Sequence, residues 1–376
     1  MSIQHVYVDR SIADKPETQQ FIRRLGLPPV MLQHPNELYE KLKRENDPCL
    51  AGKHTLLLTR NQGSFLRRCP GTRDYVCCGY HILNFGNYCT MDCAYCILQS
   101  YFHPPLLRFF VNHEDLWEEL GRAFENNSCL RVGTGEFTDS LIWESWSDLT
   151  AELVERFARQ EGSVLELKTK TTAMESLRNL EHNQKTIVSW SLNTPYVISQ
   201  YESGTASLEA RLRAAAKCES WGYPLAFHFD PIVLYPGCEK EYEQVIHSLF
   251  EHISADRVVW ISMGTFRFMP ALQAVVQERF PQSKLIHGEF VPGLDGKMRY
   301  FKPLRIQIYR RIYETIATHA PEALVYLCME DEHVWSQSVG FIPQSRGGLP
   351  AMLDQSAGRH CGLKTVCTSQ GNKRSY

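Results

Sequence analysis

Three cysteines at spacings of four and three residues constrain this chain more than any other feature. Cys89, Cys93 and Cys96 lie in the segment NYCTMDCAYC, and Tyr95 stands immediately before the third cysteine. Thiolates at this spacing can bind a cubane iron–sulfur cluster from one loop, and three ligands leave the fourth iron open. An open position distinguishes a catalytic metal site from a structural one. The spacing therefore predicts a reactive [4Fe-4S] cluster.

S-adenosylmethionine can coordinate an open iron through its amino and carboxylate groups. Electron transfer into its sulfonium then cleaves a carbon–sulfur bond and yields a 5′-deoxyadenosyl radical, while the protein positions and shields the cofactors. We expect this cosubstrate, and an electron donor of the flavodoxin or ferredoxin type. A zinc site is the alternative, but structural zinc usually takes two CxxC-type pairs, and the sequence has no second CxxC.

Composition excludes several other classes of protein. The 13 cysteines are an odd number, and the N-terminus has no apolar signal core, which argues against a disulfide framework. No apolar run reaches the roughly 18 residues that a membrane span needs. The formal net charge of −2 excludes a globally basic nucleic-acid binder and leaves a local basic face open. We expect a cytoplasmic monomer without membrane association.

Strand and helix patterns alternate along residues 81–290, which predicts parallel strands joined by helical crossovers. The candidate strands are rich in β-branched and large apolar residues and lie at 129–135, 163–169, 185–193, 224–230, 257–263 and 283–289. Helical patterns include 207–222 and 242–253. About six such units fit an α/β fold of the partial (β/α)6 TIM-type barrel, and a doubly wound open sheet is the alternative.

Two further segments flank this predicted barrel. Residues 1–80 form an expected N-terminal extension, with strands at 3–9 and 54–60 and a short helix at 18–26. Residues 291–376 form an expected C-terminal region that caps the barrel and contacts the substrate. In that region we expect a helix at 304–320, a strand at 322–329 and an irregular stretch from Gly347.

Polar residues lie at the C-terminal ends of the predicted strands, where such folds carry their active sites. They are Gly135 and Glu136, Lys168 and Lys170, Ser191 and Asn193, and His228 and Asp230. Glu136 can bind the amino group of the methionyl moiety, because a carboxylate pairs well with an ammonium, or it can form a two-carboxylate site with Asp139. His228 and Asp230 can contact the adenosyl ribose or the substrate or relay a proton, or they can form a hydrogen-bonded pair that closes the barrel.

A basic segment follows the barrel pattern. Residues 297–311 contain six lysines and arginines and no acid, with Tyr300, Phe301 and Tyr309 interleaved. Basic charge with stacking aromatics suits phosphate backbone and unstacked bases. The alternative is a solvated helix start that leads into a core helix.

Six further cysteines lie outside the motif and could serve an auxiliary cluster. They are Cys69, Cys77, Cys78, Cys328, Cys361 and Cys367. Their spacings match no ligand pattern, which favours scattered thiols over a second metal site.

These motifs together resemble the radical SAM superfamily and, within it, the spore photoproduct lyase family. The resemblance is carried by CxxxCxΦC, with Tyr95 as Φ, and by LELKTKTTAMESL, SWSLNTPYVISQYESGTASLEARL, GYPLAFHFDPI and KMRYFKPLRIQIYRRIY, and it covers most of residues 1–315. That family splits a methylene-bridged thymine dimer in DNA by hydrogen abstraction.

The resemblance also implies roles for individual residues. Cys89, Cys93 and Cys96 match the cluster ligands, and Tyr95 matches a residue near the adenine. Gly135 and Glu136 match a methionyl contact, and Lys168 and Ser191 match other contacts to the cosubstrate. Tyr300, Lys302 and Arg305 match the region that approaches lesion-bearing DNA.

Two positions depart from the family pattern. The family carries a tyrosine after the third cluster cysteine, where this chain has Ile97, and a hydrogen-returning cysteine at the second strand, where it has Gly133. These departures favour a relative that acts on another nucleoside, a peptide or a small molecule, or one whose hydrogen donor comes from elsewhere. Cys238, in a predicted strand-exit loop after Pro236 and Gly237, is the candidate donor. A non-catalytic iron–sulfur protein is the remaining alternative.

Overall fold

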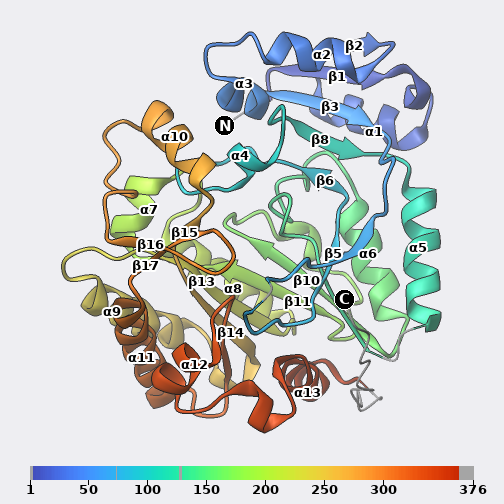
Figure 1. Ribbon diagram of the computed structural model, residues 1–376. Helices are drawn as coiled ribbons and strands as arrows, with labels where there is room; N and C mark the ends of the chain where they lie inside the picture. Colours follow the sequence, from blue (N-terminus) through green and yellow to red (C-terminus); the bar gives the residue numbers. More distant parts are fainter. Residues whose placement is uncertain (1–2, 73, 127–128, 364–376) are drawn as a thin grey trace.

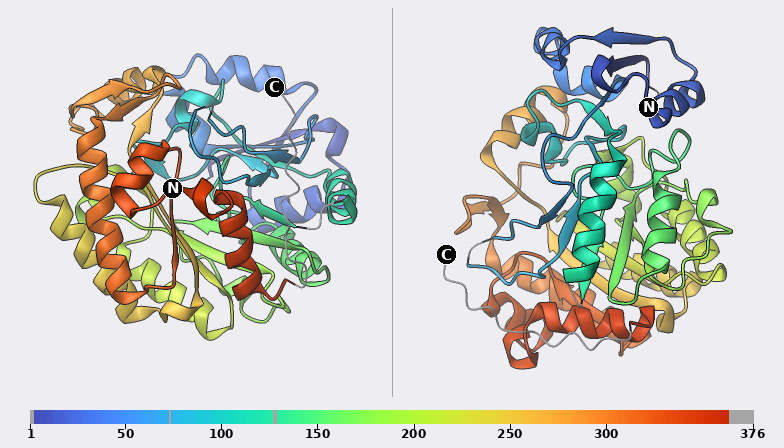
Figure 2. Two further views of the ribbon diagram at one scale, coloured as in Figure 1. Left: turned by 60° about the horizontal axis from the view of Figure 1, so that its bottom comes forward. Right: turned by 90° about the vertical axis from the view of Figure 1, so that its right-hand side faces the viewer.

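The computed structural model describes residues 3–72, 74–126 and 129–363. Figures 1 and 2 show two layers: an N-terminal sheet with its helices at the top of the molecule, and a larger curled sheet below it. Among the described residues, no helix combines the length and the apolar character that a membrane crossing needs.

The N-terminal layer is a five-stranded sheet in the order β2-β1-β3-β8-β6. Its strands are β1 (His5–Asp9), β2 (Pro29–Leu32), β3 (Thr55–Thr59), β8 (Leu107–Phe110) and β6 (Gly86–Asn87). Its helices are α1 (Pro16–Leu25), α2 (Pro35–Leu42) and α3 (Pro48–His54), and each begins with a proline, whose fixed φ suits a first helical position. The predicted strands at 3–9 and 54–60 and the helix at 18–26 are confirmed, with Gly26 ending α1 at φ 71°.

The larger sheet has eight strands in the order β18-β14-β13-β11-β10-β9-β5-β4. The strands are β4 (Leu66–Arg68), β5 (His81–Leu83), β9 (Leu130–Gly133), β10 (Ser163–Thr169), β11 (Thr186–Ser191), β13 (Leu225–Ile232), β14 (Val258–Thr265) and β18 (Leu324–Leu327). All neighbours from β5 to β18 pair in parallel, and β4 is an antiparallel edge. This curled half-barrel confirms the predicted fold class and five of the six candidate strands.

Helices cover the outside of the half-barrel (Figure 1). The helices that follow the first three are α4 (Leu98–Tyr101), α5 (His113–Asn126), α6 (Leu149–Ala158), α7 (Pro195–Tyr201), α8 (Leu208–Ser220), α9 (Cys238–His252), α10 (Pro270–Arg279), α11 (Lys302–His319), α12 (Glu332–Val339) and α13 (Leu349–Cys361), of which α4 and α10 lie toward the N-terminal layer. The predicted apolar stripe of α9 is buried, with Tyr242, Ile246 and Leu249 fully inaccessible. That burial explains why this segment forms a helix against the sheet.

Short elements complete the fold. The 3-10 helices are η1 (Arg10–Ile12), η2 (Glu175–Leu177), η3 (Ala255–Arg257) and η4 (Pro343–Arg346). The remaining strands are β7 (Asp92–Cys93) with β12 (Glu202–Ser203), and β15 (Arg267–Phe268), β16 (Phe290–Pro292) and β17 (Met298–Tyr300) in a three-stranded sheet.

Two expectations about the C-terminal half are wrong. Residues 283–289 form a turn rather than a strand, because Leu285 and Ile286 pack in a small apolar cluster beside α10. By contrast, the strand predicted at 322–329 is confirmed as β18, which pairs with β14 as the last strand of the larger sheet. The second wrong expectation is an irregular stretch from Gly347. This stretch contains the helix α13, whose Leu349, Leu353 and Ala357 are buried at helical spacing. The division into three segments at 80 and 290 stays a prediction.

Candidate active site

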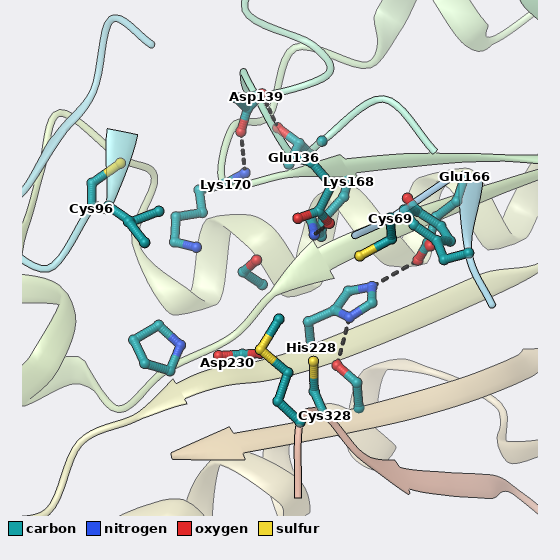
Figure 3. Close-up of a pocket in the computed structure, with 18 of the residues that line it drawn as sticks. Cys69, Cys96, Glu136, Asp139, Glu166, Lys168, Lys170, His228, Asp230 and Cys328 are labelled. Carbon is teal, nitrogen blue, oxygen red and sulfur yellow. Dashed lines mark hydrogen bonds and ion pairs between the residues drawn. The ribbon is translucent and has the colours of Figure 1, made fainter. Parts of the chain in front are cut away.

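One cavity of about 390 Å³ opens where the strands of the half-barrel end. Its volume lies in the range of small-molecule sites, about 300–1,000 Å³. All of the residues predicted to bind the cluster or S-adenosylmethionine line it, namely Cys89, Cys93, Tyr95, Cys96, Gly135, Glu136, Lys168, Ser191, His228 and Asp230. Figure 3 shows several of these side chains turned toward a common space. The cavity therefore brings together residues from five separate segments.

The loop with the three cysteines is held by backbone pairing. Cys93 in β7 pairs with Glu202 of β12, and the amide of Ala94 donates to the carbonyl of Tyr201 at 2.8 Å. Burial raises the pKa of Cys89 to about 12 and that of Cys93 well above its usual range. Because a metal binds the thiolate, iron has to displace protons from these thiols. Among the described residues, no three His, Cys, Asp or Glu side chains are placed to hold a single metal ion, these cysteines included.

Lys53 anchors this loop from the N-terminal layer, and sequence reasoning missed it. Its side chain is 1% exposed, and its ammonium donates to the carbonyl of Cys89 at 3.2 Å and to that of Met91, and lies 3.7 Å from Asp92. Arg279 of α10 holds Asp92 from the other side through two contacts of 2.9 and 3.0 Å. Both cations are far from the motif along the chain, so only the fold reveals them.

Replacing Lys53 with methionine is expected to destabilise the protein by about 1–3 kcal/mol, because buried carbonyls lose their donor. Denaturant unfolding measures this loss, and the iron content of the reconstituted protein is expected to fall with it. Lys217→Met, which removes an ammonium from a surface ion pair with Glu175, serves as the control and should change stability by less than about 0.5 kcal/mol. Equal stability and iron content in both variants would refute the anchoring role of Lys53.

Tyr95 is oriented by a buried ion pair. Its hydroxyl is hydrogen-bonded to the carboxylate of Glu202, and Arg211 of α8 contacts the same carboxylate at 2.5 Å. Arg211 also donates to the carbonyl of Ser191 at 2.8 Å and is fully buried. Burial alone would raise the pKa of Glu202, but the charges of Arg211 and Lys170 outweigh it and lower that pKa. This network fixes the aromatic ring next to the third cysteine.

Lys168 and Glu136 form an ion pair in the cavity lining, with 2.7 Å between the Lys168 Nζ and the Glu136 Oε1. A side chain at Gly135 would lie 2.7 Å from the Cβ of Lys168, so glycine is what permits this approach. Asp139, the other half of the proposed two-carboxylate site, accepts hydrogen bonds from the amides of Leu141 and Lys170 and is 9% exposed. Asp139 and Glu136 therefore both line the cavity, but backbone amides hold the Asp139 carboxylate, whereas Glu136 pairs with a side-chain ammonium.

His228 lies in a hydrogen-bonded chain on the cavity floor. Its Nε2 is 2.7 Å from Glu166 and its Nδ1 is 2.6 Å from the hydroxyl of Ser262 (Figure 3). Burial would raise the pKa of Glu166, but the charge and hydrogen bond of His228 outweigh it and lower that pKa. Asp230 instead pairs with both terminal nitrogens of Arg267, at 3.0 and 3.1 Å. The two residues predicted as a pair thus belong to two separate networks.

Tyr80 occupies the space beside Gly133. A Cβ placed on Gly133 would lie 1.3 Å from the Tyr80 hydroxyl oxygen. That hydroxyl is buried and has no hydrogen-bond partner within the described part of the chain. Tyr80 lines the cavity and Gly133 does not. The glycine at position 133 therefore leaves room for the Tyr80 side chain, a residue that the sequence analysis did not identify.

Three of the additional cysteines also reach the cavity. Cys69, Cys78 and Cys328 line it, and Figure 3 shows Cys69 and Cys328 beside His228. Cys77 is exposed, and its hydrogen bond with Cys78 lowers the pKa of Cys77 to about 6.

The other candidate thiols lie elsewhere. Cys238 begins α9, is buried, and is not among the residues that line the cavity, so its role as hydrogen donor stays a prediction. Cys361 is buried in α13. Cys367 lies outside the described residues.

Two of the three residues predicted to contact nucleic acid are interior. Tyr300 and Arg305 are each 3% exposed. Tyr300 stacks on Phe290 with ring centroids 4.5 Å apart, and Arg305 pairs with Glu330 at 3.1 Å. These two side chains therefore stabilise the fold and present no surface to DNA, as the core-helix alternative expected. Lys302 is exposed but pairs with Asp331 at 2.9 Å, and its contact with nucleic acid stays a prediction.

A parallel half-barrel with three cysteines of a CxxxCxxC loop at its mouth defines a radical S-adenosylmethionine enzyme. The family model described as spore photoproduct lyase matches residues 77–326. The spore photoproduct lyase of Bacillus subtilis (strain 168) is 26% identical over 245 residues, which cover 64% of this chain and 70% of that protein. The Clostridium acetobutylicum spore photoproduct lyase is 27% identical over 263 residues, covering 69% and 74% of the two chains. The chain therefore belongs to the spore photoproduct lyase family.

Solved structures agree on the fold. A spore photoproduct lyase complexed with dinucleoside spore photoproduct has a TM-score of 0.77 and 20% identity, and the match covers 86% of this chain and 98% of that one. A variant with bound AdoMet and the same dinucleoside gives a TM-score of 0.77 at 21% identity, with 87% and 99% covered. The half-barrel with its N-terminal layer is thus the architecture of that family.

Proposed function

We propose that this enzyme binds a [4Fe-4S] cluster through Cys89, Cys93 and Cys96 and cleaves S-adenosylmethionine reductively to abstract a hydrogen atom from its substrate. The observation that carries the proposal is the convergence of every predicted cluster and cosubstrate residue on one cavity. When bound, the cluster and S-adenosylmethionine supply a 5′-deoxyadenosyl radical. We further propose that a flavodoxin or ferredoxin supplies the electron, and that the enzyme acts as a cytoplasmic monomer.

The chain's own residues suit the cosubstrate chemically. Glu136 and Lys168 offer a carboxylate for the methionyl ammonium and an ammonium for the methionyl carboxylate, so both charged groups of S-adenosylmethionine have a partner. Tyr95 offers a fixed aromatic face next to the cluster, and Ser191 offers a polar group at a strand end. The cavity is recessed among the strands of the half-barrel, and closure over a bound substrate would protect a reactive radical from side reactions.

A DNA photoproduct of the thymine-dimer type is the first substrate candidate, because the relatives are spore photoproduct lyases. The second candidate is another nucleoside, a peptide or a small molecule. Gly133 and Ile97 favour this second candidate, since the family's usual cysteine and tyrosine for hydrogen return are replaced there. Cys69, Cys78 and Cys328 are thiols that line the cavity and could return hydrogen in either case, in place of Cys238.

Introducing cysteine at Gly133 is expected to destabilise the protein by about 1–3 kcal/mol, because its side chain overlaps Tyr80. In a double-mutant cycle, Tyr80→Ala should relieve this cost, with a favourable coupling of about 0.5–3 kcal/mol. Gly121→Cys, at a helical glycine with open space around it, is the matched control and should be well tolerated. If Gly133→Cys is as stable as wild type, Tyr80 does not close that position.

Deuterium transfer distinguishes the substrate candidates. Anaerobically reconstituted enzyme is incubated with dithionite, S-adenosylmethionine and a dinucleotide carrying a methylene-bridged, deuterated thymine pair, and 5′-deoxyadenosine is analysed by mass spectrometry. Deuterium in 5′-deoxyadenosine together with restoration of two separate thymine residues in the dinucleotide supports the lyase. Cleavage of S-adenosylmethionine without transfer from this dinucleotide, but with transfer from a deuterated nucleoside or peptide, supports the second candidate.

A further inference from the structure

A second cavity lies between the N-terminal sheet and the half-barrel, and it shares no lining residue with the first. Its volume is about 550 Å³. Residues that follow β2 and β3 contribute to it, as do Arg108 and Phe110 of β8, and these three strands run parallel in the sheet at the top of Figure 1. Ligands of open α/β sheets bind outside the carboxyl ends of such strands. The position alone therefore marks this cavity as a place for a ligand.

Buried polar atoms without partners converge on this cavity. They are the Nδ2 of Asn61, the Oδ1 atoms of Asn84 and Asn87, and the Nε of Arg108, and none has a hydrogen-bond partner within the described residues. Asn84 is 7% and Asn87 6% exposed. Asn87 and Arg108 are direct partners across β6 and β8, so their side chains leave the same face of the sheet. A buried polar atom without a partner destabilises the protein, and a ligand that hydrogen-bonds to it would remove that cost.

The charges and rings of the cavity restrict the ligand. Arg60, Arg67 and Arg108 line it, and no aspartate or glutamate is among its described lining residues, although Arg60 also pairs with Asp115 at 3.1 Å outside the cavity lining. Tyr101 is 58% exposed and stacks on Phe137, with ring centroids 5.8 Å apart and planes at 20°. An exposed ring of this kind is a platform for a flat partner. The ligand is therefore anionic, planar and able to both donate and accept hydrogen bonds.

We propose that this second cavity binds a nucleotide. Arginines suit the phosphate, asparagine amides suit the edge of a base, and the Tyr101 ring suits its face. The nucleotide is either free or one unit of a single DNA strand, since both present the same groups. Binding here requires neither the iron–sulfur cluster nor S-adenosylmethionine. The proposal for this site can therefore be tested separately from the proposed radical chemistry.

The test measures binding of dTMP and of a short fluorescein-labelled oligothymidylate to the full-length enzyme saturated with S-adenosylmethionine. Tyr101→Ala and Arg108→Gln are each expected to weaken binding at least about tenfold. Tyr101 is exposed, so its variant keeps the test decisive if Arg108→Gln misfolds. The control Arg122→Gln removes an exposed guanidinium of α5 and should leave binding unchanged. The cluster-free Cys93→Ala enzyme should bind as wild type does.

The outcomes separate the two sources of the nucleotide. Binding of dTMP supports a free nucleotide, and binding of the oligonucleotide without dTMP supports a DNA strand, provided that Tyr101→Ala weakens either one. The proposal is overturned if neither probe binds, if both variants bind as well as wild type, or if inorganic phosphate displaces the probe as effectively as dTMP does. In the last case the cavity recognises phosphate alone.

Discussion

Replacing Cys93 with alanine is expected to remove the iron–sulfur cluster and to lower 5′-deoxyadenosine formation by at least about a hundredfold. Substitutions of residues that merely support a metal ligand already cost about 10–100-fold, so loss of a ligand should cost no less. Cys93 is 7% exposed and pairs through its backbone with β12, so its thiol cannot be replaced by a neighbouring one without rebuilding the loop. Iron content and 5′-deoxyadenosine yield after reconstitution measure the two effects.

The control for this variant is Cys218→Ala. Cys218 is a fully buried thiol of α8 that does not line the cavity, so its removal costs packing but no ligand. This control should retain about four irons per chain, as wild type does, and most of the activity. Retained iron and activity in Cys93→Ala would show that the cluster is bound elsewhere, and equal losses in both variants would show that the effect is misfolding.

Removing the charge of Arg211 is expected to have the largest effect on stability. Arg211 is 0% exposed and donates to Glu202, Thr205 and the carbonyls of Ser191 and Ala206. Arg211→Met leaves the Glu202 carboxylate buried without its main cation, which typically costs about 3–5 kcal/mol. Denaturant unfolding measures this cost. The variant should also lose S-adenosylmethionine binding, because Glu202 orients the Tyr95 hydroxyl.

Arg213→Met is the matched control, two residues along the same helix. Arg213 is 64% exposed and pairs with Glu209 on the surface, so its loss should change stability by less than about 0.5 kcal/mol. The double variant Arg211→Met with Glu202→Gln should recover part of the lost stability, since no unpaired charge then remains buried. The account is contradicted if Arg211→Met and Arg213→Met are equally stable.

The ring of residues around the first cavity could be predicted because parallel strands end at one edge. Glu136 follows β9, and Lys168, Ser191 and His228 lie in β10, β11 and β13, yet the parallel order brings them to one place. The same reasoning identified β9, β10, β11, β13 and β14 from their apolar runs. The apolar runs of the strands, together with the rule that parallel strands end at one edge of a sheet, were sufficient to predict this part of the site.

The parts that escaped prediction depend on contacts between distant segments. Lys53 reaches the cluster loop from α3, and Arg279 reaches it from α10, although nothing in their neighbouring residues marks them. Tyr80 fills the space beside Gly133 only because β5 and β9 are neighbours in the sheet. Sequence spacing shows which residues a strand presents, but it does not show what a different element places against them.

The nucleic-acid prediction for the basic segment at 297–311 has a related weakness, because the charge of a side chain in the sequence does not reveal whether that side chain is buried. Its Arg305 is neutralised by Glu330, which lies beyond the end of α11 in the connection between β18 and α12. Its Arg299 pairs with Asp295, just outside the acid-free window. The candidate nucleotide site instead uses Arg60, Arg67 and Arg108, which no run of charge in the sequence brings together.

The yield of 5′-deoxyadenosine tests the central claim most directly. The wild-type enzyme is reconstituted with iron and sulfide without oxygen, reduced with dithionite and supplied with S-adenosylmethionine, and the products are separated by chromatography. We predict about four irons per chain and formation of 5′-deoxyadenosine that depends on Cys93. A protein that binds this iron fully yet forms no 5′-deoxyadenosine, with any candidate substrate present, would contradict the proposed radical chemistry.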